Sequence, residues 1–160
     1  ASVAPAVINT LLRDAAHAGL ALGFYADRVR HVFERFARIG RDFYASETRW
    51  AAQPFWRERA AWPDVAPSHE AGPPRLLATA LRPVVENGFV REREVALTTE
   101  QPLGVWRVAD VEIAPLLRGL PREAEARGAA LGARIERAGQ GSAARVAALQ
   151  GWLRRHGLLP

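Results

Sequence analysis

Residues 19–62 read GLALGFYADRVRHVFERFARIGRDFYASETRWAAQPFWRERAAW and show the clearest periodicity in the chain. Numbered in heptads, the segment places a large apolar side chain at every seventh position: Leu22, Val29, Phe36, Phe43 and Trp50. Charged residues occupy the positions of the opposite face. A stripe of this kind is typical of an amphipathic helix. We expect the stripe to form the core of the fold because large rings bury much area, and a partner or ligand groove is the alternative.

The helix is predicted to end near Ala52, because Pro54 disfavours helical conformation at the residue before it. Proline suits the first turn of a new helix, so PFWRERAAW predicts a short helix that stops at Pro63. Three tryptophans follow one another at intervals of six residues. At about 100° per residue they cannot share one helix face, so at least one ring packs elsewhere or lies exposed. The sequence therefore predicts a partner-binding surface, with a place in the core as the alternative. Its residues are Trp50, Phe55, Trp56 and Trp62.

Composition limits the class of protein. The 160 residues suit one domain, and the absence of cysteine excludes disulfides and thiolate metal sites and fits a cytoplasmic location. No apolar run reaches about 18 residues, so no membrane span is expected. All 22 basic residues are arginine. Together with the abundant alanine, this pattern is typical of a GC-rich bacterial gene, and the net charge of +5 therefore does not by itself require a polyanionic partner.

The rest of the chain predicts a mainly α fold, an antiparallel helical bundle with one β-hairpin in its C-terminal half. Residues 5–18 form a first helix, and Gly19 and Gly23 a turn or kink before the aromatic helix. Residues 63–73 are rich in Pro, Gly and Ser and predict a linker. We expect a single domain over residues 1–160, which can be subdivided at this linker into a helical hairpin and a helix–hairpin–helices part.

The C-terminal part follows from local patterns. Residues 75–87 predict a helix that is kinked at Pro83 and stopped by Asn87-Gly88. Alternating residues at 94–99 and 105–113 predict a hairpin. Residues 121–138 predict a helix with Leu131 and Ile135 inward, and Ser142 is the expected N-cap of the last helix.

Motifs for chemistry are scarce. The sequence holds no P-loop, GxGxxG, GxSxG or HExxH pattern. His69-Glu70 lies in the expected linker, where catalytic residues often occur, but a lone His-Glu pair has little specificity. We therefore expect no catalytic residue, no metal and no cofactor, and regard an enzyme as the less favoured class.

One weak anion-binding pattern is present. The glycine-rich segment GQGSA, residues 139–143, precedes a helix whose N-terminus could hold an anion, although a flexible turn is the favoured interpretation. Residues 113–160 carry eight arginines against three acids. The hypothesis is that Arg134, Arg137 and Arg145 bind phosphate or a carboxylate.

The segment LLATALRPVVENGFVREREVALTTEQPLGVWRV, residues 76–108, resembles the recognition helix and wing of winged helix–turn–helix regulators. The likeness covers about a fifth of the chain and implies a DNA-binding regulator. Residues 74–112, however, carry five arginines against six acids, whereas a DNA-reading element must neutralise phosphates. Pro83 also interrupts the would-be recognition helix.

Three classes of function follow. The favoured hypothesis is a non-catalytic accessory or assembly protein that binds another protein, or a second copy of itself, through the Trp-rich surface. The first alternative is a nucleic-acid-binding regulator with a winged-helix-like hairpin. The second alternative is a small-ligand-binding or enzymatic module with an aromatic cavity between its N-terminal helices.

Overall fold

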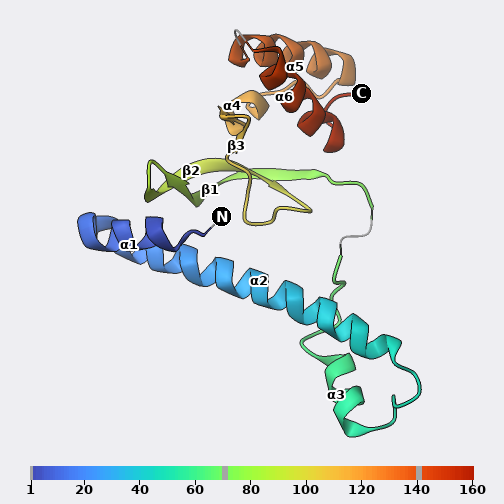
Figure 1. Cartoon of the computed structure of the whole chain (residues 1–160). Coiled ribbons are helices and arrows are strands. Elements are labelled where there is room, and N and C mark those ends of the chain that lie inside the picture. Colours follow the sequence, from blue (N-terminus) through green and yellow to red (C-terminus); the bar gives the residue numbers. More distant parts are fainter. Residues whose placement is uncertain (1, 70–71, 140–141) are drawn as a thin grey trace. The chain divides into compact units, whose positions relative to one another are not determined.

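The computed structural model describes residues 2–69, 72–139 and 142–160 (Figure 1). Helices and strands mix along the chain, and the strands form two small two-stranded sheets, β1–β2 and β3–β4. The fold is therefore mixed α+β: the expectation of many helices with an antiparallel hairpin is confirmed in part, whereas the helical bundle and the all-α class are wrong. The chain forms two compact units, residues 1–71 with 88–90, and residues 72–87 with 91–160. The single domain stays a prediction.

The first unit begins with helix α1 (Ala4–Arg13), the 3₁₀ turn η1 (Ala15–His17) and helix α2 (Ala18–Ser46). The chain turns at Asp14, whose backbone leaves the helical region and whose carboxylate bonds His17 Nδ1 at 3.0 Å. The turn expected at Gly19 and Gly23 is wrong, because both glycines lie inside α2. A glycine in a helix interior costs only about 1 kcal/mol, which packing can offset.

The core of this unit lies where α1 meets the start of α2. Val7, Ala21, Phe24 and Val90 are buried together. Thr10, also fully buried, donates to the carbonyl of Ala6 and accepts from the backbone N–H of Val90 at 2.8 Å. The hydroxyl therefore satisfies a buried backbone donor of residues 88–90 and fixes these residues on α1.

The heptad stripe is not part of this core, which corrects the main expectation for the aromatic helix. Leu22, Val29, Phe36 and Phe43 are all at least half exposed, and Phe43 reaches 73%. Trp50 lies beyond the end of α2. The physical reason is length: at about 1.5 Å per residue, the ten residues of α1 span only about a third of the 29 residues of α2.

Strand β1 (Leu76–Glu86) occupies the region expected to be helical, and it pairs with β2 (Phe89–Thr98). Asn87 and Gly88 both have positive φ, 50° and 79°, as a two-residue hairpin turn requires. The Asn-Gly pair is thus a hairpin signal and not a helix stop. Since β1 has β2 as its only neighbour among the described strands, Pro83 lies on an edge strand, where proline is tolerated. The resemblance to a winged helix fails with it, because the expected recognition helix is a strand.

A second tight hairpin replaces the long strand expected at residues 105–113. Strands β3 (Arg107–Val108) and β4 (Val111–Glu112) pair antiparallel, with Arg107 opposite Glu112. The turn residues Ala109 and Asp110 both have positive φ. Of the expected hairpin only the bridge between Ala96 and Val105 remains.

The core of the second unit is formed by α4 (Ala114–Leu117), α5 (Ala124–Ala138) and α6 (Ala143–Arg155). Ile113, Leu131, Ile135, Leu149 and Leu153 are at most 1% exposed. The inward positions predicted for Leu131 and Ile135 are confirmed. Ser142 is the N-cap of α6, as predicted, and its side chain accepts from the backbone N–H of Arg145 at 3.2 Å.

Candidate functional site

The candidate site is a groove in the first unit between α2 and the short helix α3 (Pro54–Ala61), which starts at Pro54 as predicted. Its volume is about 510 Å³, within the range of about 300–1,000 Å³ typical of ligand pockets. The lining residues come from both helices and from the residue after α3: Ala37, Gly40, Arg41, Tyr44, Glu58, Arg59 and Trp62.

Aromatic rings form the walls of the groove. The ring of Tyr44 meets those of Phe55 and Trp56 edge to face, at centroid distances of 6.0 and 5.6 Å. Trp62 packs against Phe33 of α2 in the same way at 5.7 Å. Such pairs contribute about 0.5–1.5 kcal/mol beyond their burial. The rings that hold α3 on α2 therefore also shape the groove.

The residues predicted from the sequence to bind a partner gather here only in part. Trp62 lines the groove, and Phe55 and Trp56 contact its wall residue Tyr44. Trp50 lies in the turn before α3, with its backbone carbonyl accepting from Gln53. Trp50, Phe55 and Trp62 are about half exposed, whereas Trp56 is more buried. Their role in binding stays a prediction.

Charged groups line the same groove. The guanidinium of Arg59 stacks on the ring of Phe55 at 3.8 Å, which keeps the cation close to the aromatic wall. Glu58, one residue earlier on α3, lines the groove with an exposed carboxylate. The groove thus offers aromatic faces, a fixed cation and a hydrogen-bond acceptor.

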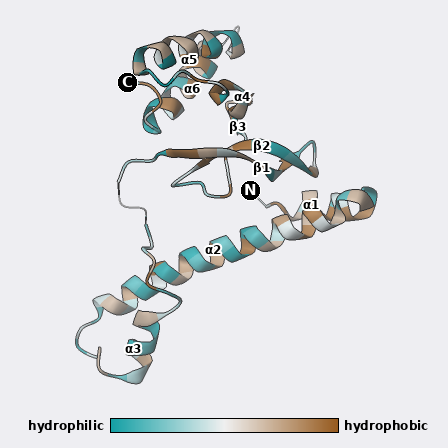
Figure 2. Ribbon diagram, turned by 180° about the vertical axis from the view of Figure 1, so that it is seen from behind, coloured by the Kyte–Doolittle hydropathy of each residue, from teal (hydrophilic) through white to brown (hydrophobic). Residues whose placement is uncertain are grey.

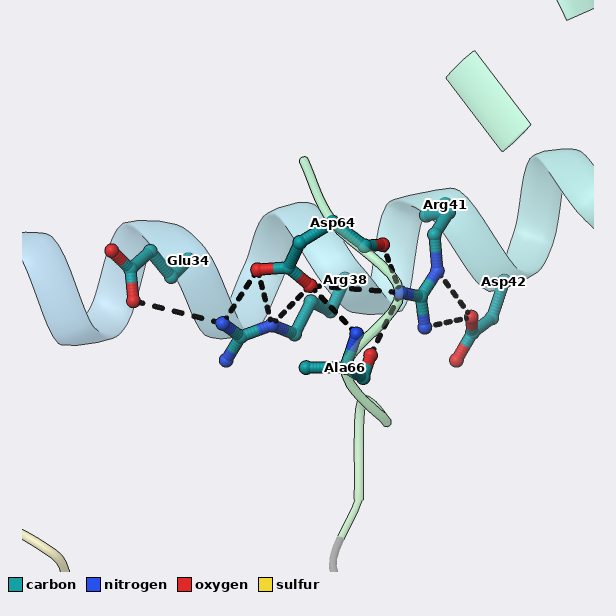
Figure 3. A network of polar contacts seen from close by, with 6 residues as sticks. All are labelled: Glu34, Arg38, Arg41, Asp42, Asp64 and Ala66. Carbon is teal, nitrogen blue, oxygen red and sulfur yellow. Dashed lines mark hydrogen bonds and ion pairs between the residues drawn. The ribbon is translucent and has the colours of Figure 1, made fainter. Parts of the chain in front are cut away.

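The segment after α3 is fastened along α2 by two arginines (Figure 3). Arg38 donates two hydrogen bonds to the carboxylate of Asp64, from Nε at 3.0 Å and from Nη2 at 2.7 Å. Arg41 donates from Nη1 to the backbone carbonyls of Asp64, at 2.5 Å, and Ala66, at 2.7 Å. Bidentate pairs of this kind fix geometry as well as adding energy. The start of the expected linker is therefore held in place.

The arginines set the charge state of the carboxylates. Hydrogen bonds from Arg38 lower the pKa of Asp64 below its ordinary value, and the backbone N–H of Ala66 adds to the effect. A hydrogen bond from Ser68 and another from Arg41 lower the pKa of Asp42. Both carboxylates are thus charged near neutral pH and keep residues 64–68 against α2.

His69, the weak catalytic candidate, lies in this segment. It is exposed, and its charge interaction with Asp42 is one of the smaller causes of the low pKa of that carboxyl. Its sequence neighbour Glu70 lies outside the described residues. Within the described part of the chain no group of three or more metal-ligating side chains gathers, and no helix is long and apolar enough to cross a membrane.

The expected anion site at residues 139–143 falls partly outside the described residues, since Gln140 and Gly141 are not described. Two of its arginines are engaged elsewhere. Arg134 donates to the carbonyls of Leu116 and Arg118, and Arg145 donates to the carbonyl of Ala109. Arg137 is exposed. Anion binding there stays a prediction.

Sequence reasoning missed Tyr44, Arg41, Glu58 and Arg59, which complete the groove. These residues lie outside the regular apolar stripe of α2 or on the short helix α3. Only the docking of α3 on α2 brings them together. Asp64 is a sequence signal for this docking, because a carboxylate just after α3 can pair with the arginines of α2.

The comparisons with known proteins give one match. No model of a protein family and no curated protein matches the sequence. The structure is similar to that of the peptidyl tryptophan dihydroxylase QhpG, which is essential for tryptophylquinone cofactor biogenesis, with a TM-score of 0.74 and 40% identical residues. The match covers 98% of this chain but 35% of QhpG, so the chain spans about a third of the length of the solved protein.

This match contradicts the favoured hypothesis of a non-catalytic accessory protein. At 40% identity over nearly the whole chain, the similarity extends beyond the fold, and the similar protein is an enzyme. Of the alternatives considered from the sequence, the enzymatic module with an aromatic cavity agrees better with it.

Proposed function

We propose that this chain is a module of an enzyme that oxidises tryptophan side chains within a polypeptide, and that the groove between α2 and α3 holds a tryptophan-bearing segment of that polypeptide. The single observation that carries the proposal is the 40% identity to a peptidyl tryptophan dihydroxylase over 98% of the chain. Because the chain spans 35% of that enzyme, the proposal concerns recognition of the polypeptide and assigns no chemical step to the residues of this module.

The chemistry of the groove fits such a segment. The rings of Tyr44 and Trp62 offer faces and edges on which an indole can stack. Glu58 offers a carboxylate oxygen to an indole N–H, which is a donor only. Ala37 and Gly40 contribute little side-chain volume on the α2 side and leave room for a bulky group.

The enzymatic part of the proposal is tested on the whole protein that carries this chain. Mass spectrometry of tryptic peptides from its source cells should reveal tryptophans that have gained oxygen, and these should disappear when the gene is deleted and return when it is restored. Oxidised tryptophan that persists unchanged in the deletion strain contradicts the proposal. A cytoplasmic location also stays a prediction, which fractionation of the same cells would check.

The groove is tested by filling it. A Cβ added at Gly40 would meet no atom within 4 Å. Replacing a glycine inside a helix also stabilises the helix by about 1 kcal/mol. Gly40→Leu should therefore fold at least as well as the parent while occupying the space for the ligand. We expect it to weaken binding of N-acetyl-tryptophanamide, followed by the NMR signals of Tyr44 and Trp62, by about tenfold or more, as losing a good apolar contact would.

The matched control is Gly23→Leu, which also places leucine at an open glycine of α2 but away from the groove. It should leave the binding of N-acetyl-tryptophanamide unchanged. If both variants bind like the parent, or if N-acetyl-alaninamide shifts the same signals equally, the groove does not recognise an indole.

A further inference from the structure

One face of α2 carries an apolar stripe that the described residues of its own unit leave largely exposed. At about 100° per residue, its members fall within roughly a third of the helix circumference. Figure 2 shows hydrophobic and hydrophilic residues alternating along the helix, as expected of an amphipathic one. The stripe consists of Leu22, Tyr25, Val29, Val32, Phe33, Phe36 and Phe43, which are 44–73% exposed.

The size of this stripe sets it apart from ordinary surface leucines. From Leu22 to Phe43 it extends for about 32 Å along the helix axis, at about 1.5 Å per residue. Isolated apolar side chains on a surface need no explanation, but contiguous apolar patches of this extent mark a surface that is covered in the working protein. Helix α1 packs on Ala21 and Phe24, and Trp62 after α3 meets the edge of the stripe at Phe33, yet Phe33 and Phe36 stay 58% and 65% exposed.

An unpaired cation borders the stripe. Arg28 is half-buried over the ring of Phe24 at 4.5 Å, and its Nε has no hydrogen-bond acceptor among the described residues. Burial lowers the pKa of Arg28. A buried donor of this kind costs free energy unless an acceptor reaches it. The surface that covers the stripe should therefore bring a carboxylate to Arg28.

Pairing of the stripes of two copies does not meet this requirement. Arg30 lies near the other border of the stripe, so pairing two stripes would bring cations together. Three acids of α2, Asp27, Glu34 and Asp42, lie on the opposite face at about 100° per residue. The acid at the end of the stripe, Glu47, is already engaged, since hydrogen bonds from Arg49 lower its pKa to about 2.

We propose that the stripe on α2 is the docking face for the catalytic body of the enzyme, an apolar surface with a carboxylate that pairs with Arg28. The inference rests on the proposed function: QhpG has about two thirds of its length outside the region that this chain matches, which is ample polypeptide for such a body. Docking would place the groove beside the oxidising chemistry. The body belongs to the same polypeptide as this chain, as the remaining length of QhpG does, and crosslinks to a different polypeptide would overturn this assignment.

The docking is tested by photocrosslinking in the whole protein as its source cells make it. p-Benzoylphenylalanine replaces Phe36 at the centre of the stripe and, as the control, His31 on the opposite face of α2. We expect the Phe36 position alone to give crosslinks, and mass spectrometry to place them in polypeptide outside residues 1–160. Crosslinks to residues 1–160 of the same or a second copy, or no crosslinks above the His31 control, would overturn the proposal.

The carboxylate is tested by charge. Arg28→Glu should lose most of the crosslink at Phe36, because a hydrogen-bonded ion pair is replaced by repulsion, while Arg30→Glu, about 160° from Arg28 around α2, should keep it. Equal crosslinks in the two variants would remove Arg28 from the interface. Docking and enzymatic function fail separately: crosslinks without oxidised tryptophan refute the proposed function, and oxidised tryptophan without crosslinks refutes the docking.

Discussion

The core of the second unit and the stripe on α2 are both built from regularly spaced apolar residues on helices, yet they have opposite surroundings. Leu131 and Ile135 of α5 are closed off by α4 and α6 and are almost inaccessible to water. Phe36 and Phe43 of α2 are mostly exposed. Periodicity therefore identifies which residues share a helix face. Whether that face is covered depends on the length and position of a second element, which periodicity does not contain.

The largest expected effect compares a residue from each surface. Ile135→Ala should lower the free energy of unfolding by about 2–5 kcal/mol, because it removes a fully buried side chain and leaves a cavity. Phe43→Ala, although it removes a larger side chain, should change it by no more than about 0.5 kcal/mol. Urea unfolding of the two variants measures both. Similar losses would mean that the stripe is covered within the chain itself.

The next effect concerns how closely helices approach in the second unit. A Cβ at Gly139 would lie 2.4 Å from Val146 Cγ2 and 3.0 Å from the carbonyl oxygen of Ile135. Gly139→Ala should therefore cost about 1–3 kcal/mol of stability through overpacking between α5 and α6.

Gly132→Ala is the matched control on α5, because a Cβ there meets no atom within 4 Å. This substitution should be neutral or stabilise by up to about 1 kcal/mol. Thermal unfolding distinguishes the two signs. A neutral Gly139→Ala would show that α5 and α6 are less tightly packed than the buried leucines between them suggest.

Where local chemistry alone decides the structure, the sequence was sufficient. Pro54 starts α3, Ser142 caps α6, and the inward side of α5 is as predicted. Errors arose where the competing state was also local. Residues 75–87 have apolar spacing compatible with a helix, but Asn87-Gly88 and Pro83 favour a hairpin with an edge strand, and this turn chemistry decides the structure.

The candidate site could be predicted only in outline. Phe55, Trp56 and Trp62 were found because large rings around a proline-bounded helix are visible in sequence. Tyr44 and Glu58 were not, because their place in the groove depends on how α3 docks on α2. The proposed enzymatic class rests on the similarity to a known enzyme, since a groove without a catalytic motif carries no signature of a reaction.

The smallest expected effect sharpens the comparison at the level of single bonds, because the polar contacts that hold residues 64–66 on α2 are only part-buried, whereas the core of the second unit is closed to water. The pKa of Asp64 is lowered by Arg38, so its stabilising contribution is complete above the ordinary value of 3.8 and is lost as pH falls through the lowered value in the folded protein. Acidification below pH 3.8 should therefore loosen residues 64–66 before the core. The amide of Ala66, which donates to Asp64 Oδ1 at 3.0 Å, reports this through hydrogen exchange.

In Asp64→Asn that amide should exchange faster at neutral pH and lose its acid dependence, whereas Arg35→Gln on the same helix should leave both unchanged. If the Ala66 amide stays protected in acid until the whole protein unfolds, the contacts that hold residues 64–66 on α2 do not depend on the charge of Asp64.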